Sequence, residues 1–162
     1  MGKVVLICGR VCSGKSRYAA RLRDSCSGIV LSADEATWYL CGNRQRKFYN
    51  ELVEKVKLYL RKKAADAVAA GCNVILDWGF WTALERREIS GYFSSKGVEY
   101  EWHYIDIDEI SLRKNIHDRN HLVTSGYDRC NFYVDDVLAQ KCAELFEMPS
   151  AQEIDVWHTV KR

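Results

Sequence analysis

The sequence predicts an α/β fold in which a mainly parallel five-stranded sheet carries helices on both faces. Three observations predict it. Near the start of the chain, a short apolar run leads through a glycine-containing loop into a helical pattern. Apolar β-branched runs then alternate with stretches of helical periodicity to the end of the chain. Carboxylates follow two of these runs, where parallel sheets bind their ligands. We therefore expect a three-layer sandwich of βαβ units.

The loop at 9–16 has the complete spacing of a phosphate-binding P-loop, with a glycine, four residues and then Gly-Lys-Ser. It follows a strand expected at 4–8 and opens a helix expected over 15–25. Glycine dihedrals turn successive N–H groups inward, and the helix N-terminus adds its positive dipole end. Lys15 should reach the β- and γ-phosphates of ATP, and Ser16 should help to hold Mg²⁺. The predicted nucleotide-binding residues of this P-loop NTPase sandwich are Gly9, Arg10, Val11, Cys12, Ser13, Gly14, Lys15 and Ser16.

The remaining elements follow in alternation. Apolar runs predict strands at 28–32, 73–77, 101–107 and 154–160. Helical patterns occupy about 45–70, 82–97, the stretch from 108 through Arg119, and 134–146. Gly71 is a natural C-cap for the first of these, and Thr82 with Glu85 forms a capping box for the second. The segment 121–132 has turn residues and predicts a loop. We expect one domain over 1–162, with a lid at 108–132.

Composition limits the classes of protein that fit. The chain has 162 residues, with 48% hydrophobic and 28% charged residues, as in a soluble globular domain. A net charge of +2 argues against a dedicated nucleic-acid surface. No apolar run reaches membrane-spanning length, and the first residues enter a strand rather than a signal peptide. The seven cysteines form no C-x-x-C pair. We expect a cytoplasmic protein with reduced thiols.

Two carboxylates follow strands at the edge where the P-loop lies. Asp34 comes just after the second strand, and Asp77 closes the third. Asp34 is suited to accept the proton of a substrate hydroxyl that attacks the γ-phosphate, with Glu35 as a second candidate; alternatively, Asp34 caps a helix. Asp77 stands where this architecture places the acid that orients the Mg²⁺ shell, or it is a turn residue. The sequence leaves open which of the two is the base.

Positive charge is needed where the transferring phosphoryl group spreads its negative charge. Arg119 lies at the expected end of the charged helix, beside the loop at 121–132. This arrangement predicts a lid that closes on the nucleotide and supplies Arg119 as a catalytic group. Arg113 on the same helix is a second candidate. Both arginines also fit a solvated helix face.

Aromatic residues follow both carboxylates. Trp78-Gly79-Phe80-Trp81 comes directly after Asp77, and Trp38 follows Asp34 by four residues. Such rings wall an acceptor site by stacking on a ring or apolar body, or they pack in the core. Arg86 and its neighbour Arg87 line the same site or belong to a solvated helix face. The predicted acceptor-binding residues are Asp34, Trp38, Trp78 and Arg86.

At this point the chain resembles a known family. Residues 73–81, with Glu85-Arg86-Arg87 behind them, resemble the signature of small bacterial ATP-binding proteins of the zeta-toxin and chloramphenicol-phosphotransferase group. The pattern at 145–149 followed by Glu153 is similar to the C-terminal pattern of these proteins, and Arg119-Asn120 matches their lid. The resemblance spans essentially the whole chain. It implies a P-loop kinase fold that uses ATP and Mg²⁺ to phosphorylate a hydroxyl of a small molecule, with the acid at Asp34 as the base.

One departure from that family is Arg10-Val11-Cys12, where small uncharged residues are usual. Arg10 contacts a phosphate or the acceptor, or it points to solvent.

The sequence therefore predicts a small-molecule kinase that transfers the γ-phosphate of ATP to an alcohol on an unidentified acceptor. A second interpretation is a nucleotide-dependent switch or ATPase without an acceptor. A third is a kinase that acts on a nucleic-acid end, because the helix at 45–70 carries basic residues, which also fit a solvated face. These residues are Lys55, Lys57, Arg61, Lys62 and Lys63.

Overall fold

The computed structural model describes residues 2–42, 48–128 and 131–160. Within these ranges, five strands form one sheet in which all neighbouring strands run parallel, in the order β2-β3-β1-β4-β5. The predicted parallel sheet is confirmed. The strands are β1 (Val4–Cys8), β2 (Ile29–Ser32), β3 (Val74–Gly79), β4 (Tyr100–Ile107) and β5 (Val156–Val160).

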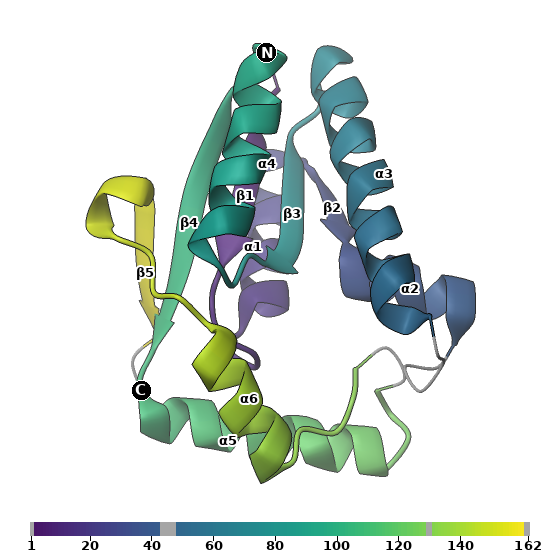
Figure 1. The fold of residues 1–162 in the computed structure, drawn as a ribbon, viewed down its shortest axis with the longest axis vertical. Coiled ribbons are helices and arrows are strands. Elements are labelled where there is room, and N and C mark those ends of the chain that lie inside the picture. The colour runs from purple at the N-terminus through teal and green to yellow at the C-terminus, as the bar shows by residue number, and fades with distance from the viewer. Residues whose placement is uncertain (1, 43–47, 129–130, 161–162) are drawn as a thin grey trace.

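Helices cover both faces of this sheet, as predicted for a three-layer sandwich. In Figure 1, α3 and α4 lie on the near face and α1 lies behind, while α5 and α6 lie beyond the lower ends of the strands. The helices are α1 (Lys15–Cys26), α2 (Ala33–Cys41), α3 (Tyr49–Ala69), α4 (Ala83–Ser95), α5 (Glu109–Thr124) and α6 (Asp136–Leu145). A short 3₁₀ turn, η1 (Ala151–Glu153), precedes β5.

The core lies on both faces of the central strand β1, whose five residues are all buried. Val4 and Leu6 belong to a cluster that also contains Ala64 of α3 and Phe93 of α4. Val5 and Ile7 belong to the cluster that contains Ala19 of α1. A strand buried on both faces requires a continuous apolar run, which is why the sequence shows no polar alternation there.

The sequence reading missed one helix and misplaced the end of another. Helix α2 follows β2 without a loop, and Tyr39 and Leu40 on it are 78% and 66% exposed, so that its apolar residues mark no buried stripe. Helix α5 continues past Arg119 to Thr124, so the first part of the loop predicted at 121–132 is helical. The predicted helix start at residue 45 lies outside the described residues, and α3 begins at Tyr49.

The turn that follows β3 has an unusual backbone. The register between β1 and β3 shifts, pairing Ile7 with Asp77 but Cys8 with Gly79. Gly79 and Phe80 then both have positive φ angles, 90° and 46°. A left-handed conformation costs a residue such as Phe80 about 1–2 kcal/mol. The amide of Gly9 donates to the Gly79 carbonyl at 3.1 Å and ties this turn to the P-loop.

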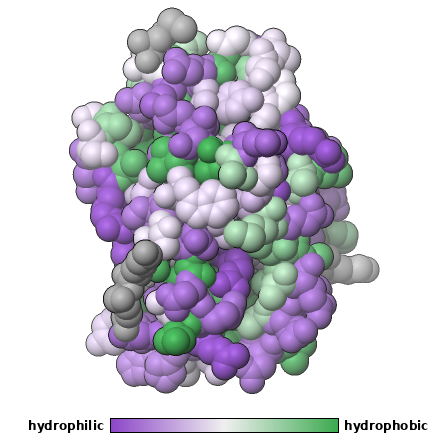
Figure 2. All heavy atoms as spheres, turned by 90° about the vertical axis from the view of Figure 1, so that its left-hand side faces the viewer, coloured by the Kyte–Doolittle hydropathy of each residue, from purple (hydrophilic) through white to green (hydrophobic). Residues whose placement is uncertain are grey.

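On the face beside β5, hydrophilic and apolar side chains are interspersed (Figure 2). Val156 and Trp157 of β5 are 37% and 39% exposed, and the Trp157 indole donates to Asp106 at 3.2 Å. None of the helices in the described ranges is long and apolar enough to cross a membrane.

Candidate active site

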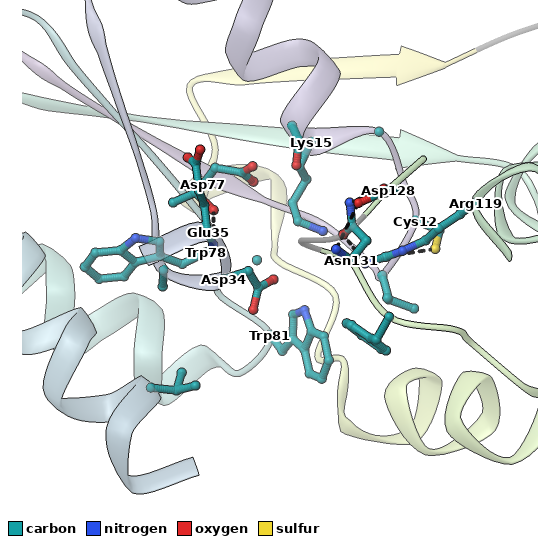
Figure 3. A pocket seen from close by; sticks show the side chains of 18 of the residues that line it. Cys12, Lys15, Asp34, Glu35, Asp77, Trp78, Trp81, Arg119, Asp128 and Asn131 are labelled. Carbon is teal, nitrogen blue, oxygen red and sulfur yellow. Dashed lines mark hydrogen bonds between the residues drawn. The ribbon is translucent and has the colours of Figure 1, made fainter. Parts of the chain in front are cut away.

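A cavity of about 600 Å³ lies at the carboxyl ends of the central strands. The P-loop, the beginning of α2, the end of β3 and one face of α5 contribute to its lining, as does the beginning of α3. Figure 3 shows Lys15, Asp34, Trp81 and Arg119 around this space. Stretches that are far apart in the sequence therefore meet at the edge where the sequence predicted a ligand site.

The P-loop folds back on its own lysine. Gly14 (φ 97°) and Cys12 (φ 59°) adopt left-handed conformations, and the Lys15 ammonium donates to the carbonyls of Gly9 at 3.0 Å and Arg10 at 2.7 Å. Burial lowers the pKa of Lys15, and the charge of Asp77 opposes this effect. No side chain caps the N-terminus of α1 at Gly14 among the described residues. Its first N–H groups and the ammonium fit an anionic ligand such as a polyphosphate.

Gly9 is required by close packing rather than by its φ angle. A Cβ atom built on it would lie 2.8 Å from the Ser13 hydroxyl and 3.2 Å from the Ile105 carbonyl oxygen. The Ser13 hydroxyl is buried and has no hydrogen-bond partner among the described residues. A side chain at position 9 would therefore push the P-loop away from β4.

Asp77 lines the cavity beside the P-loop and is 8% exposed. Burial raises its pKa, while the Lys15 ammonium and a hydrogen bond from Ser16 oppose that shift. A hydroxyl and a carboxylate in contact are the hard oxygen donors that Mg²⁺ prefers, together with water and nucleotide phosphates. The described residues contain no group of three or more His, Cys, Asp or Glu side chains that could hold a metal. Ser16 and Asp77 thus fit a Mg²⁺ ion that takes most of its other ligands from phosphate and water.

Asp34 is the second residue of α2, and it is exposed on the lining of the cavity. The alternative that it caps the helix is wrong, because Ser32 is the N-cap and accepts a bond from the Glu35 amide at 3.3 Å. Its charge contributes to the pKa shifts of both Lys15 and Asp77, so the three groups form one electrostatic cluster. Asp34 is therefore the more accessible of the two carboxylates.

The aromatic residues divide between the cavity and the core. Trp78 and Trp81 line the cavity, and the Trp78 indole is fixed by a bond to the Leu31 carbonyl at 3.2 Å. Phe80 is 4% exposed, with its ring edge-on to Trp102 at 5.0 Å. The prediction for Trp38 is not supported, since it is not among the lining residues. Four residues of α2 carry it about 6 Å along the helix from Asp34.

Helix α5 holds Arg119 against the P-loop. One guanidinium nitrogen donates to the Cys12 sulfur at 3.2 Å and another donates to Asn131, while the group lies 4.6 Å from the centre of the Phe132 ring. Asn115, one turn earlier, donates to the Cys12 carbonyl at 2.9 Å. The helix thus brings Arg119 into the cavity, whereas Arg113 is exposed and does not line it.

The Arg10 side chain, predicted to contact a phosphate or the acceptor or to point to solvent, is not among the residues that line the cavity. Its guanidinium pairs with Glu109 and donates to the Ile107 carbonyl at 2.9 Å. Arg10 therefore joins the P-loop to the beginning of α5, and it contributes its carbonyl, rather than its charge, to the bonds of Lys15.

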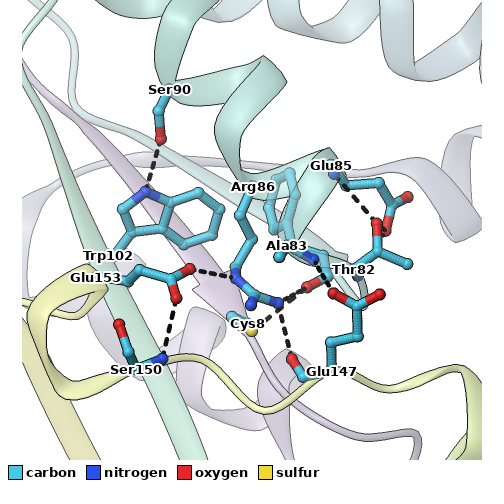
Figure 4. Close-up of polar contacts among 11 residues, drawn as sticks. Cys8, Thr82, Ala83, Glu85, Arg86, Ser90, Trp102, Glu147, Ser150 and Glu153 are labelled. Carbon is cyan, nitrogen blue, oxygen red and sulfur yellow. Dashed lines mark hydrogen bonds and ion pairs between the residues drawn. The ribbon is translucent and has the colours of Figure 1, made fainter.

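The prediction that Arg86 lines the acceptor site is wrong. Arg86 is 2% exposed and binds Glu153 at 2.9 Å, the Phe80 carbonyl at 3.2 Å and the Glu147 carbonyl at 2.9 Å (Figure 4). It shares the inward face of α4 with Ile89, which is also buried. Its neighbour Arg87 is exposed and is not among the lining residues either.

The basic residues of α3 do not form an unpaired stripe. Three of the five form ion pairs with acidic side chains, and a fourth lies over an aromatic ring. The contacts are Lys55 with Glu51 at 2.7 Å, Lys57 with Glu54 at 3.0 Å and Glu85 at 3.2 Å, Lys63 with Asp66 at 2.9 Å, and Arg61 over the Tyr92 ring at 4.5 Å. These contacts reduce the exposed positive charge of α3, the feature that favoured a nucleic-acid kinase.

Sequence reasoning missed several lining residues. Asn115, Asp118 and Leu122 line the cavity together with Arg119. Their spacing of three and four residues places them on one face of α5, a signal that was present in the sequence. Tyr49 and Asn50, by contrast, line the cavity from the beginning of α3, and no local pattern marks them.

Comparisons with known proteins agree with this geometry. Residues 4–131 match the model of the AAA_33 family, described as an AAA domain. The chain is also 30% identical over 131 residues to the "Protein KTI12 homolog" of Arabidopsis thaliana. That match covers 77% of this chain and 43% of the relative, so the chain spans less than half the length of the relative.

Solved structures show a similar fold. The APS kinase CysC of Mycobacterium tuberculosis, solved with AMPPNP and APS, has a TM-score of 0.68 and 17% identity, with 99% of this chain and 90% of that chain covered. Kti12 of Chaetomium thermophilum, solved with ADP-AlF3, has a TM-score of 0.69 and 10% identity, with 97% and 88% covered. At identities of 17% and 10%, these similarities show a shared fold, the fold of P-loop kinase-like ATP-binding proteins. The narrower zeta-toxin and chloramphenicol-phosphotransferase grouping stays a prediction.

Proposed function

We propose that this chain, which belongs to the AAA_33 family of AAA domains, moves the γ-phosphate of ATP to a hydroxyl group of a small molecule. The observation that carries the proposal is a single cavity lined by Lys15, Ser16, Asp77, Asp34 and Arg119. A phosphate cradle alone supports nucleotide binding. A second, exposed carboxylate in the same cavity supports the activation of a nucleophile.

The positive groups stabilise the transferring phosphoryl group. The Lys15 ammonium now binds two loop carbonyls, and phosphate oxygens compete with those carbonyls for it. Arg119 approaches from α5, within a proposed lid at 108–132, and its charge lies where negative charge spreads in the transition state. Mg²⁺ supplies further neutralisation of the phosphates when bound, and Ser16 and Asp77 would hold it.

The two carboxylates differ in burial, and they therefore suit different roles. Asp77 is buried and bonded to Ser16, which suits a metal ligand and hinders contact with an acceptor. Asp34 is exposed on the cavity lining, which suits a general base. The acceptor oxygen forms a bond to the γ-phosphorus, the bond between that phosphorus and the bridging oxygen of ADP breaks, and the hydroxyl proton passes to Asp34.

The wall that Trp78 and Trp81 form, on the turn tied to the P-loop by the Gly9–Gly79 bond, is suited to hold the acceptor. Trp78 and Trp81 offer rings to an apolar or cyclic body, and they exclude water that would otherwise take the phosphoryl group. We place the reaction in the cytoplasm, where ATP is available and where the free thiols found among the described cysteines stay reduced.

The similarity to the KTI12 homologue favours a second candidate. In that case the chain hydrolyses ATP as a switch, and a macromolecular partner takes the place of the small acceptor. The two candidates predict different fates of the γ-phosphate.

The test follows the γ-phosphate by ³¹P NMR while the protein consumes ATP and Mg²⁺ with a panel of neutral, anionic and amine-bearing alcohols. We expect a new phosphomonoester with one class of alcohol and an equal amount of ADP. Lys15→Ala should abolish this transfer, whereas Lys63→Ala, which alters an exposed ion pair of α3, should not. Free phosphate released at one rate with every alcohol would reject the kinase in favour of the ATPase.

A further inference from the structure

We infer that Glu147, Arg86 and Glu153 are positioning residues for the acceptor wall, the part of the cavity lined by Trp78 and Trp81. These three residues hold the turn after β3 from outside the cavity, and so they fix the position of the Trp81 indole. The inference rests on the proposed function insofar as it assigns that wall to an acceptor. It concerns groups that lie outside the cavity and that the transfer itself does not use (Figure 4).

The turn needs such support because its backbone is strained. Phe80 has a φ of 46°, a conformation that a bulky residue keeps only where its surroundings hold it there. Its carbonyl accepts bonds from Arg86 at 3.2 Å and from the Cys8 thiol at 3.4 Å. The residue that follows is Trp81, so any relaxation of Phe80 turns the indole within the cavity.

The C-terminal segment provides the other half of the support. The Glu147 amide donates to the Trp81 carbonyl at 2.8 Å. The Glu147 carboxylate accepts from the Ala83 amide at 2.9 Å, and the Glu147 carbonyl accepts from Arg86. Glu147 thus bonds to Trp81 in the turn, to Ala83 at the start of α4 and to Arg86.

Glu153 completes the arrangement by neutralising the buried guanidinium. It binds the Arg86 Nε at 2.9 Å, and its own position is fixed by the capping bond from the Ser150 amide at 3.0 Å. A buried arginine without a carboxylate would carry an uncompensated charge, so the pair keeps Arg86 available to the two carbonyls.

This arrangement explains two sequence patterns at once. Glu85-Arg86-Arg87 and the pattern at 145–149 with Glu153 lie about sixty residues apart in the sequence, and they meet where Arg86 binds Glu147 and Glu153. The family match ends at residue 131, before the second pattern begins. Acceptor selectivity in this chain therefore depends on a segment beyond the matched region.

Glu147 is the best residue for a test because it is exposed and its replacement does not empty the core. Glu147→Ala removes the acceptor of the Ala83 amide, whereas Glu147→Gln keeps an oxygen there. Glu88→Ala, an exposed glutamate of α4, is the matched control. Four quantities are measured: acrylamide quenching of the Trp81 fluorescence, obtained against a Trp81→Phe background; the Kd of the fluorescent analogue mant-ATP; the KM of ATP; and the KM of the alcohol that the panel identifies.

In Glu147→Ala we expect stronger quenching of Trp81 and an alcohol KM raised about tenfold, as for the loss of one charge-assisted hydrogen bond. The Kd of mant-ATP should stay at its wild-type value, and Glu147→Gln should restore the quenching and the alcohol KM. A glutamine variant that behaves like the alanine variant would overturn the inference, as would an equal rise of the ATP and alcohol constants. If no alcohol accepts phosphate, the proposed function fails, and the quenching decides the inference alone: unchanged quenching in Glu147→Ala rejects it.

Discussion

Replacing Gly79 with alanine tests whether the position of Trp81 depends on a backbone that glycine allows. Gly79 has a φ of 90°, and a Cβ atom there would lie 2.6 Å from the Trp81 Nε1 and 3.0 Å from its Cδ1. The left-handed conformation alone costs an alanine about 1–2 kcal/mol. The overlap with the indole adds a second cost and forces Trp81 to move.

Gly71 offers a control in which an alanine pays for the left-handed conformation but overlaps with no other side chain. It has a φ of 89°, and a Cβ atom there would meet no atom within 4 Å among the described residues. For a chain of this size, each 1 kcal/mol lowers the Tm by about 2–4 °C. Gly71→Ala should therefore lower the Tm by about 2–8 °C, and its kinetics should be those of the wild type.

Thermal unfolding and steady-state kinetics of Gly79→Ala and Gly71→Ala measure the differences in Tm and in the KM of the acceptor. We expect Gly79→Ala to lose more stability than Gly71→Ala and to raise the KM of the acceptor, because the displaced indole changes the wall. Equal Tm losses in the two variants, with the acceptor KM unchanged, would refute the conclusion that Gly79 and Trp81 are packed against each other for the site.

Two further predictions concern Asp77 and the cap of α2, the helix that carries Asp34. Asp77→Asn should abolish Mg²⁺-dependent transfer and should gain stability relative to the wild type as the pH rises, because burial raises the pKa of Asp77 and makes its ionised form unfavourable in the folded state. Since the pKa of Asp77 is raised in the folded state, the wild type loses stability as the pH rises above the ordinary pKa of 3.8, whereas Asp77→Asn does not. The Tm of Asp77→Asn minus that of the wild type should therefore increase with pH. A difference that is independent of pH would contradict the prediction. Ser32→Ala removes the cap of α2, which costs about 1 kcal/mol and should lower the Tm by about 2–4 °C. The substitution should reduce the transfer rate more than it reduces the affinity for ATP. Ser25→Ala on α1 serves as its control in both measurements, and equal losses of rate in the two serine variants would disprove the role of the cap.

The sheet and the P-loop could be predicted because their signals are local. Strand β1 is buried on both faces and therefore shows an unbroken apolar run. The P-loop needs its glycines and its lysine at fixed spacing, because a Cβ at Gly9 or a right-handed Gly14 would change the cradle. The capping box of Thr82 and Glu85 was likewise readable, and the structure contains it.

The errors arise where distant residues decide the outcome. Arg86 looks like any arginine of a charged helix, and its burial depends on Glu147 and Glu153, more than sixty residues away. The side chain of Arg10 is drawn from the phosphate region by Glu109, which is 99 residues away. Helix α2 was missed because its apolar residues form no clear buried stripe, although Ser32 is a typical N-cap.

The role of Asp34 can be measured most directly in Asp34→Asn, by comparing the rate of phosphoryl transfer to the alcohol with the Kd of mant-ATP. Asparagine keeps the size of the side chain on the first turn of α2 and removes its ability to take a proton. Asp24→Asn, an exposed aspartate of α1 paired with Arg23, is the control. We predict that Asp34→Asn lowers the transfer rate by about 10²- to 10⁴-fold, as for the loss of a general base, with the Kd of mant-ATP unchanged. A transfer rate close to that of the wild type would contradict the assignment of Asp34 as the base.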